Sequence, residues 1–225
     1  MPFQGDPHSS RTCILLIDPI RPDPFILQKV KVTLEHGGIV AYPTETFYGL
    51  GVDAFQAEAI QKLFRLKGRP AGVPVSVLVR DREMLNRLVL SVPHIAERII
   101  EAFLPGPLTV VLRASQSLPK ELIGETGTIG IRISSHPLIT HMFAYCQSPF
   151  TTTSANPSGL PPATNAGMVS GYFQEGIDLL VDGGPVPGGM ASTVVDASGR
   201  VPVVLREGAV SRDDLLMVAG RLSER

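Results

Sequence analysis

The fold prediction starts from one stretch, Gly38-Ile-Val-Ala-Tyr-Pro-Thr-Glu-Thr-Phe-Tyr-Gly-Leu-Gly51. Its first residues are mostly apolar and predict a strand over 38–42, and Pro43 with the hydroxyl-bearing residues after it predicts a loop over 43–51. Beyond this loop, apolar residues recur at helical spacing and predict a helix from about 55 to 66. In this interpretation Gly49 and Gly51 shape a turn between strand and helix, since a third glycine that would complete a dinucleotide-binding fingerprint is missing.

The same alternation of strands and helices continues on both sides of this stretch. Asp23 and Pro24 form a start signal for a helix that Gly37 ends. Further strands are expected at 12–17, 74–80, 108–113, 128–133, 179–181, 192–196 and 201–206, and further helices at 81–89, 93–103, 138–146 and after Ser211. The sequence therefore predicts a loose arm over 1–10 and a single α/β domain over 11–225, with parallel and antiparallel strand pairs in one sheet flanked by helices.

Composition limits the function classes. The chain has 225 residues, 44% of them hydrophobic, which is enough for a sizeable core. Lysine and arginine total 20 against 21 aspartate and glutamate, so the net charge of −1 excludes a globally basic, nucleic-acid-coating protein. Cys13 and Cys146 show no metal-ligand spacing, and no segment reads as a signal or a membrane span. We expect a cytoplasmic protein without membrane association, in which any anion site is local.

A basic stretch after the 55–66 helix is the first candidate site. Lys62 and Arg65 are interpreted as a solvated helix face. Lys67 and Arg69 flank Gly68 and precede a proline, which predicts a constrained loop that can aim both cations at one carboxylate or phosphate.

Two other loops carry polar groups that can be interpreted in two ways. The hydroxyl-rich segment 151–158 follows a short apolar strand, and either caps a helix or turn or binds a ligand at a strand end. The glycine-rich segment 182–189 is either a plain flexible loop or one whose backbone amides approach phosphates. No Walker phosphate loop, nucleophile–base pair or carboxylate dyad is present, and no histidine is given a catalytic role. This inventory suits an enzyme that works by positioning and charge neutralisation.

Taken together, the motifs resemble the YrdC family of threonylcarbamoyl-AMP synthases. The matching stretches occur in the family's order over about residues 24–211. They are Gly38 to Gly51, Lys67-Gly-Arg-Pro70, Pro105-Gly-Pro-Leu-Thr109, Gly130-Ile-Arg132, Ser154-Ala-Asn156 with Ser158-Gly159, and Ser192-Thr-Val194 followed by Arg206.

The resemblance implies a twisted, largely mixed sheet flanked by helices, with an open, positively lined cavity, in the short single-domain form of the family. It implies a nucleotidyltransferase that makes L-threonylcarbamoyladenylate from L-threonine, bicarbonate and ATP with release of pyrophosphate, for threonylcarbamoyl modification of the tRNA adenosine next to the anticodon. Mg²⁺ is expected to arrive with ATP, because the sequence shows no dense carboxylate cage. Weak tRNA binding and contact with the downstream threonylcarbamoyl transferase machinery are further partner hypotheses.

The resemblance also implies roles for individual residues. The implied catalytic residues are Lys67, Arg69, Ser154 and Asn156. The implied L-threonine-binding residues are Thr46, Tyr48, Arg132, Thr152 and Ser192. The implied ATP-binding residues are Arg69, Val73, Thr128, Ser154, Pro162 and Arg206. No residue is assigned to a metal. The sequence departs from the family pattern at Glu45, where aspartate is commoner, at Leu78, where some members have histidine, and at Glu207, where proline is usual.

The mechanism expected from the resemblance needs no protein nucleophile. The threonine amine captures CO₂ from bicarbonate as a carbamate, whose oxygen attacks the α-phosphorus of ATP. Lys67, Arg69 and Arg206 would offset the repulsion between the two anions. The alternatives are an RNA-binding module of the same fold, another carbamoyl transfer, and a weakly active regulatory paralogue.

Overall fold

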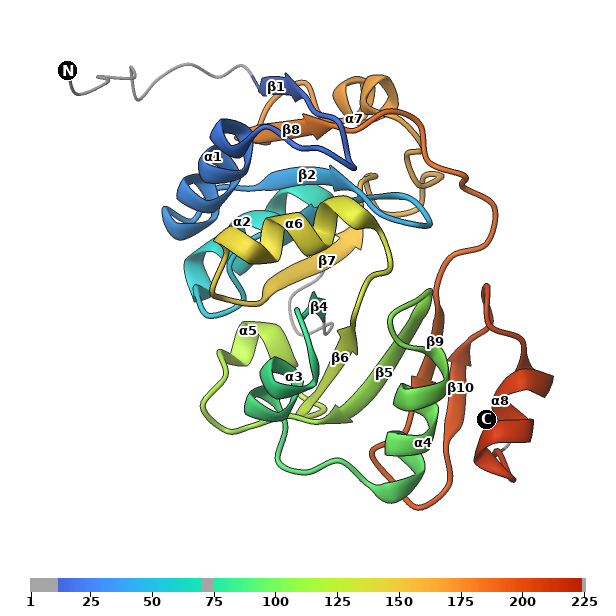
Figure 1. Ribbon diagram of the computed structural model, residues 1–225. Coiled ribbons are helices and arrows are strands. Elements are labelled where there is room, and N and C mark those ends of the chain that lie inside the picture. Colours follow the sequence, from blue (N-terminus) through green and yellow to red (C-terminus); the bar gives the residue numbers. More distant parts are fainter. Residues whose placement is uncertain (1–11, 70–74, 224–225) are drawn as a thin grey trace.

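A computed structural model describes residues 12–69 and 75–223, in which one ten-stranded sheet runs through the molecule (Figure 1). The predicted arm over 1–10 and the candidate residue Val73 lie outside the described residues. The strand order is β1-β8-β2-β3-β7-β4-β6-β5-β9-β10. The strands are β1 Cys13–Leu16, β2 Val40–Pro43, β3 Tyr48–Gly51, β4 Ser76–Leu78, β5 Leu108–Arg113, β6 Thr128–Arg132, β7 Phe150–Ser154, β8 Leu179–Asp182, β9 Thr193–Asp196 and β10 Val203–Arg206.

The sheet is mixed, which confirms the predicted fold class. Strand β8 pairs in parallel with β1 and β2, and parallel pairs also join β4 to β6 and β5 to β9. Antiparallel pairs join the other neighbours, including β2–β3, β3–β7 and β7–β4 at the centre of the sheet. Strands that are far apart in the sequence are therefore neighbours in the sheet.

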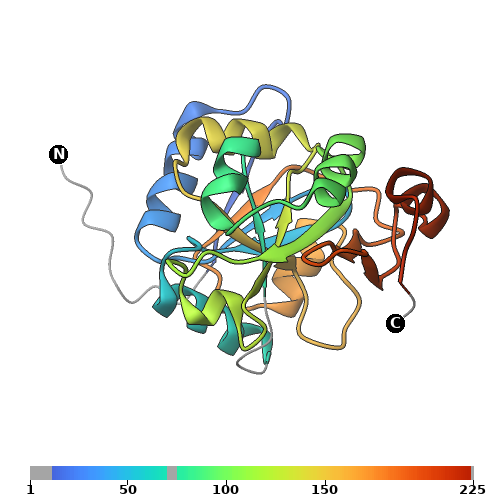
Figure 2. The ribbon, with the colours of Figure 1, turned by 90° about the horizontal axis from the view of Figure 1, so that it is seen from below.

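Helices cover both faces of the sheet, and α1 packs beside α6, α2 beside α5 and α4 beside α8. Figure 2 shows α1, α3, α4 and α6 along one side of the sheet and α2 and α5 along the other. The helices are α1 Pro24–Glu35, α2 Ala57–Lys67, α3 Arg82–Leu88, α4 His94–Phe103, α5 Lys120–Ile123, α6 Pro137–Tyr145, α7 Ala166–Tyr172 and α8 Arg212–Ala219. No helix in the described part of the chain is long and apolar enough to cross a membrane.

Helix α1 forms as its sequence predicts. The Asp23 side chain accepts a hydrogen bond of 2.8 Å from the backbone N–H of Phe25, and Pro24 occupies the first turn, where its missing N–H costs nothing. Gly37, at a φ of +73°, takes the left-handed conformation that ends the helix.

The predicted loop over 43–51 is wrong in its second half, because 48–51 form strand β3. Strand β3 pairs with β2 as a tight hairpin, with Tyr42 opposite Gly49. A Cβ on Gly51 would lie 2.7 Å from the Thr151 carbonyl oxygen, and one on Gly49 would lie 3.1 Å from the Tyr42 ring. Close approach inside the sheet therefore explains these glycines, rather than the predicted turn between strand and helix.

Two other local predictions need correction, and two short helices were not predicted. The hydroxyl-rich residues 151–154 belong to strand β7 itself, so their side chains alternate along it instead of following its end. Lys67 is the last residue of α2 and not part of a loop. The short helices α5 and α7 were not predicted, since neither has enough residues to show a clear apolar period.

Candidate functional site

A cavity of about 1070 Å³ opens along the centre of the sheet, between the β2–β3 hairpin and the β9–β10 pair. Every sequence-predicted site residue that the structure describes lines this cavity. These residues are Thr46, Tyr48, Lys67, Arg69, Thr128, Arg132, Thr152, Ser154, Asn156, Pro162, Ser192 and Arg206. The described lining contains four Lys or Arg residues and one carboxylate, Asp196.

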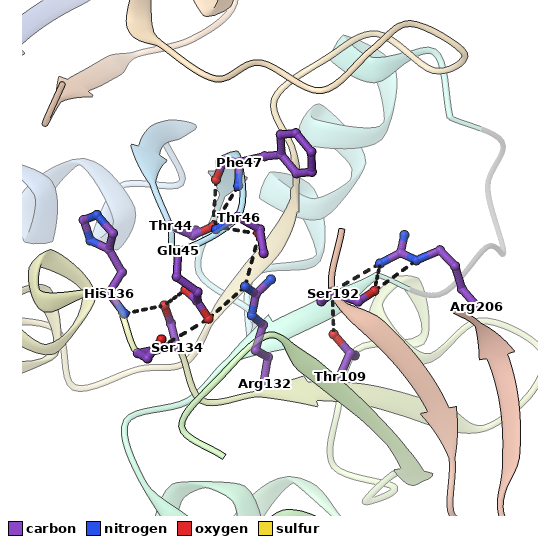
Figure 3. A network of polar contacts seen from close by, with 11 residues as sticks. Thr44, Glu45, Thr46, Phe47, Thr109, Arg132, Ser134, His136, Ser192 and Arg206 are labelled. Atoms are coloured by element: carbon purple, nitrogen blue, oxygen red, sulfur yellow. Dashed lines mark hydrogen bonds and ion pairs between the residues drawn. The ribbon is translucent and has the colours of Figure 1, made fainter. Parts of the chain in front are cut away.

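The turn between β2 and β3 is fixed by one side chain. The Thr44 hydroxyl accepts hydrogen bonds from the backbone N–H groups of Thr46 and Phe47, and donates to the Phe47 carbonyl oxygen at 2.7 Å. Because its polar groups are paired internally, the turn is a rigid platform. It holds Glu45 and Thr46 against the end of β6 (Figure 3).

Arg132 is the last residue of β6. Among the four cavity cations it is the second most buried, after Lys67, and 7% of its side chain is exposed. Its Nη2 lies 2.8 Å from Glu45 Oε1 and donates to Thr46 Oγ1 at 3.2 Å. Its Nε is buried and has no hydrogen-bond partner among the described residues. A buried N–H donor without an acceptor is costly, so this atom points to a ligand that supplies one.

Glu45 is held in its ionised form. Burial alone would raise the pKa of its carboxyl group, but the Arg132 guanidinium and the hydrogen bonds from Ser134 and Arg132 outweigh burial and lower that pKa. The Ser134 hydroxyl donates to Glu45 Oε2, and the Ser135 N–H lies 3.4 Å from Oε1. The carboxylate is therefore shared by Arg132 and the loop after β6.

Ser192, which directly precedes β9, lies beside Arg206 and Thr109 in the cavity wall (Figure 3). The Arg206 guanidinium donates to the Ser192 carbonyl oxygen at 2.7 and 3.2 Å and to its hydroxyl at 3.2 Å. The Ser192 and Thr109 hydroxyls lie 3.4 Å apart. Glu207 forms no ion pair with Arg206 in the part of the chain that the structure describes.

Lys67 supports the loop after β7 from the end of α2. Its Nζ donates to the carbonyl oxygens of Ser154 and Asn156, the latter at 2.7 Å, and its own carbonyl oxygen accepts from the Ser158 N–H at 3.1 Å. Burial, with a smaller contribution from nearby Arg69, lowers the pKa of Lys67 to about 8. An anion bound here would stabilise the charged ammonium.

Arg69 reaches the same end of the cavity because Gly68 adopts the left-handed conformation, with a φ of +61°, and turns the chain away from α2. The Arg69 guanidinium lies 5.8 Å from the centre of the Phe64 ring, and its burial lowers its pKa. Asn156 donates both amide hydrogens to backbone carbonyls, of Pro157 and Leu160, whereas its buried Oδ1 accepts from no described residue.

Tyr48 lines the cavity, but its hydroxyl group points into the glycine-rich loop. It donates to the Gly184 carbonyl oxygen at 2.7 Å and lies 3.3 Å from Asp182 Oδ1. The Gly188 N–H also donates to the Thr46 carbonyl oxygen at 3.0 Å. The loop over 182–189 is therefore anchored to the β2–β3 hairpin.

Sequence reasoning missed the polar groups that support the predicted residues. Glu45 was noted only as a departure from a family pattern, and Thr44, Thr109 and Ser134 were given no role. A buried carboxylate beside an apolar strand was the available signal, because such a charge needs a cationic partner.

A cavity lined by cations and hydroxyl groups, set in a mixed α/β sheet, defines a class of proteins suited to small anionic and zwitterionic ligands. The family model for Sua5, YciO and YrdC proteins, described as "Telomere recombination", matches residues 32–208. The chain belongs to this family, which confirms the resemblance seen in its motifs.

Named relatives agree with this assignment. The chain is 35% identical to the threonylcarbamoyl-AMP synthase of Pyrococcus abyssi over 84% of its own length and 56% of the relative. It is 35% identical to the threonylcarbamoyl-AMP synthase of Bacillus subtilis over 88% of its length and 57% of the relative. The chain thus spans a little more than half the length of these two relatives. The crystal structure of P. abyssi Sua5 complexed with L-threonine has a TM-score of 0.90 and 33% identity, covering 95% of this chain and 63% of that one.

Proposed function

We propose that the protein is a threonylcarbamoyl-AMP synthase, a nucleotidyltransferase that joins L-threonine, bicarbonate and ATP into L-threonylcarbamoyladenylate and releases pyrophosphate. The observation that carries the proposal is the buried, unpartnered Nε of Arg132 in the same cavity as Lys67, Arg69 and Arg206. The part of the cavity wall around Arg132 thus offers a donor for a carboxylate, and the remaining wall offers cations for phosphates. The relatives named as synthases support the same activity.

L-Threonine would bind between the β2–β3 hairpin and β9. Its carboxylate would accept from Arg132 Nε, and its hydroxyl would meet the hydroxyl groups of Thr46 and Ser192, both of which are buried in the cavity wall. Thr152 of β7 lines the same region. Such a site would favour threonine over serine by about 1–3 kcal/mol, the value of one additional buried methyl group.

ATP would bind with its triphosphate toward Lys67, Arg69 and Arg206. Thr128, Ser154 and Pro162 also line the cavity and remain nucleotide-binding candidates. Mg²⁺ would enter as part of the ATP substrate. The described residues contain no group of three or more His, Cys, Asp or Glu side chains that could hold a metal, and Asp196 is the one carboxylate in the described lining, so these residues do not fit a protein-held Mg²⁺ cage.

The reaction then follows from positioning. Bicarbonate takes up one proton and loses water to give CO₂. The threonine nitrogen, as the free amine, forms a bond to the carbon of CO₂ and releases one proton, which replaces the proton that bicarbonate consumed. A carbamate oxygen attacks the α-phosphorus of ATP, the bond from that phosphorus to the oxygen of the β-phosphate breaks, and pyrophosphate departs. The cations lower the repulsion between the carbamate and the triphosphate, and the two fixed ends of the cavity bring the reacting atoms together.

Pyrophosphate release in drop-out mixtures tests the proposal. We expect release only when ATP, L-threonine and bicarbonate are all present, because each supplies an atom of the product. Equal release without threonine or without bicarbonate would contradict the synthase assignment. Turnover in the complete mixture also decides between a full enzyme and a weakly active regulatory paralogue.

The product would serve threonylcarbamoyl modification of tRNA, with contact to a downstream transferase and a cytoplasmic location as parts of the same proposal. An RNA-binding role has less support, because the net charge is −1 and the chain has 6% aromatic residues and no Trp, which leaves few side chains for bases to stack on. We expect tRNA binding to be weak and to fall steeply with salt. Submicromolar RNA affinity at physiological salt, tighter than ATP affinity, would favour the RNA-binding alternative.

A further inference from the structure

The ion pair between Glu45 and Arg132 lies at the wall of the cavity, with its two members in different positions. Arg132 lines the cavity, whereas Glu45 is not among the described lining residues and contacts Arg132 at 2.8 Å. The side chains are 7% and 16% exposed. Any effect of Glu45 on a ligand therefore passes through Arg132.

Glu45 is itself fixed on three sides. The Thr44-centred turn places its backbone, the Ser134 hydroxyl donates to Oε2, and Arg132 Nη2 lies 2.8 Å from Oε1 (Figure 3). This arrangement occupies one nitrogen of the guanidinium and leaves the buried Nε without an acceptor. The carboxylate thus fixes the orientation of the guanidinium in the cavity wall.

The same pair also sets the local charge. Arg132 and Glu45 together carry no net charge, so this pair adds no net positive charge to the part of the cavity wall that it forms, whereas Arg206, beside Ser192, has no carboxylate partner among the described residues. Lys67 has no carboxylate partner among the described residues, since its Nζ donates to carbonyl oxygens. It is therefore a cation without an internal counterion. The wall around Arg132 therefore differs in charge from the walls around Lys67 and Arg206.

We propose that Glu45 is a positioning and specificity residue, which holds Arg132 for the threonine carboxylate and, by neutralising it, keeps phosphate groups out of the amino-acid end. This inference rests on the proposed function. Without the carboxylate, Arg132 would be a buried, uncompensated cation and would attract the most highly charged anion available. ATP could then compete with threonine for the wrong end of the cavity.

The test measures threonine binding by titration calorimetry on the full chain, without ATP, over a series of inorganic phosphate concentrations. For Glu45→Gln we expect about tenfold weaker threonine binding and about tenfold stronger competition by phosphate. Glu45→Asp keeps the negative charge, so phosphate should compete with threonine no more strongly in this variant than in the wild type. Glu97→Gln is the matched control, because Glu97 pairs with Arg82 at 3.0 Å on the exposed surface and should change neither value.

Phosphate competition separates specificity from simple loss of structure, because a loosened site would bind both ligands less well. Thermal melts check folding, and if Glu45→Gln does not fold, Ser134→Ala decides. It removes the hydrogen bond to Oε2 and should weaken threonine binding about threefold, with a matching gain in phosphate competition. Wild-type threonine affinity and unchanged phosphate competition in the folded variants would overturn the inference alone. A wild-type chain that binds no threonine would overturn the proposed function as well.

Discussion

The two ends of the cavity differ in whether a carboxylate of the protein neutralises their cation. At the end of β6, Arg132 is neutralised by Glu45 within the protein at 2.8 Å. At the end of α2, Lys67 donates to two neutral carbonyl oxygens, and burial lowers its pKa to about 8. A cation that has an internal counterion orients a neutral or zwitterionic ligand, whereas a desolvated cation that lacks one gains most from an incoming anion. The difference supports our proposal that threonine binds at the first end and the triphosphate at the second.

Arg132→Ala should produce the largest effect, because it removes the carboxylate donor and leaves Glu45 buried without a partner. We expect threonine kcat/KM to fall more than about 100-fold, and stability to fall by about 3–5 kcal/mol. Denaturant melts and pyrophosphate release measure the two losses. The double variant Glu45→Gln/Arg132→Met should recover much of the stability but none of the activity. Near-normal threonine kcat/KM in a folded Arg132→Ala protein would remove the basis for the amino-acid end.

Arg69→Ala tests the phosphate end. Each charge-assisted hydrogen bond lost should cost about 1.5–3 kcal/mol, or roughly 10- to 150-fold in kcat/KM, while the fold survives. Arg69→Lys should fail nearly as badly, since an ammonium group cannot reproduce the planar fork.

The control for Arg69 is Lys62→Ala on the exposed face of α2. Lys62 pairs with Asp178 at 2.8 Å, and its side chain is 41% exposed, so its loss should cost at most about 1 kcal/mol of stability and no activity. If Arg69→Ala keeps wild-type kcat/KM, the anion-clamp role is wrong.

The pKa of Lys67 predicts a smaller, pH-dependent effect. The ammonium is charged below about pH 8, so ATP affinity should fall roughly tenfold between pH 7 and pH 9 as the group loses its proton. Lys67→Met should bind ATP weakly and show no such fall. Because this pKa is depressed on folding, the unfolded chain binds more protons between about pH 8 and 10.5, and wild-type stability should rise across that window relative to Lys67→Met. Calorimetric titrations with ATP at several pH values, with denaturant melts, provide the check.

Thr109→Val should have the smallest effect, because the hydroxyl group of Thr109 makes one long contact, with Ser192. Its hydroxyl group is buried and lies 3.4 Å from the hydroxyl group of Ser192. This weak contact is worth about 0.5–1.5 kcal/mol. We therefore expect about a 2- to 10-fold loss in kcat/KM for threonine, with ATP affinity unchanged. Thr33→Val on the exposed side of α1, where the hydroxyl bonds the Lys29 carbonyl, should leave both values unchanged. A larger loss in ATP affinity than in threonine affinity would place Thr109 at the phosphate end.

Local signals explain which parts of this picture the sequence could predict. Asp23 and Pro24 act on the first turn of α1, and Gly37 acts directly after its last turn, so the bounds of α1 follow from them. Strand β3 was missed because its glycines are needed for contacts with Tyr42 and with the Thr151 carbonyl oxygen, which lies far along the chain.

The candidate site shows the same limit. The family motifs identified the cavity-lining residues, because each motif can be recognised from a short stretch of sequence. The partner that holds Arg132 could not be read from spacing, because Glu45 meets it only after β2, β3 and β6 have taken their places in the sheet. Pairings across a sheet depend on the whole topology and leave no local pattern.

The most direct test of the account is to follow labelled carbon. The protein is incubated with ¹³C-bicarbonate, L-threonine and Mg²⁺-ATP, and the products are identified by mass spectrometry. We predict an adenylate that carries both threonine and one ¹³C atom, formed in equal amount with pyrophosphate and absent from the Arg132→Ala reaction. Formation of AMP or ADP at the same rate without a labelled threonine adduct would contradict it.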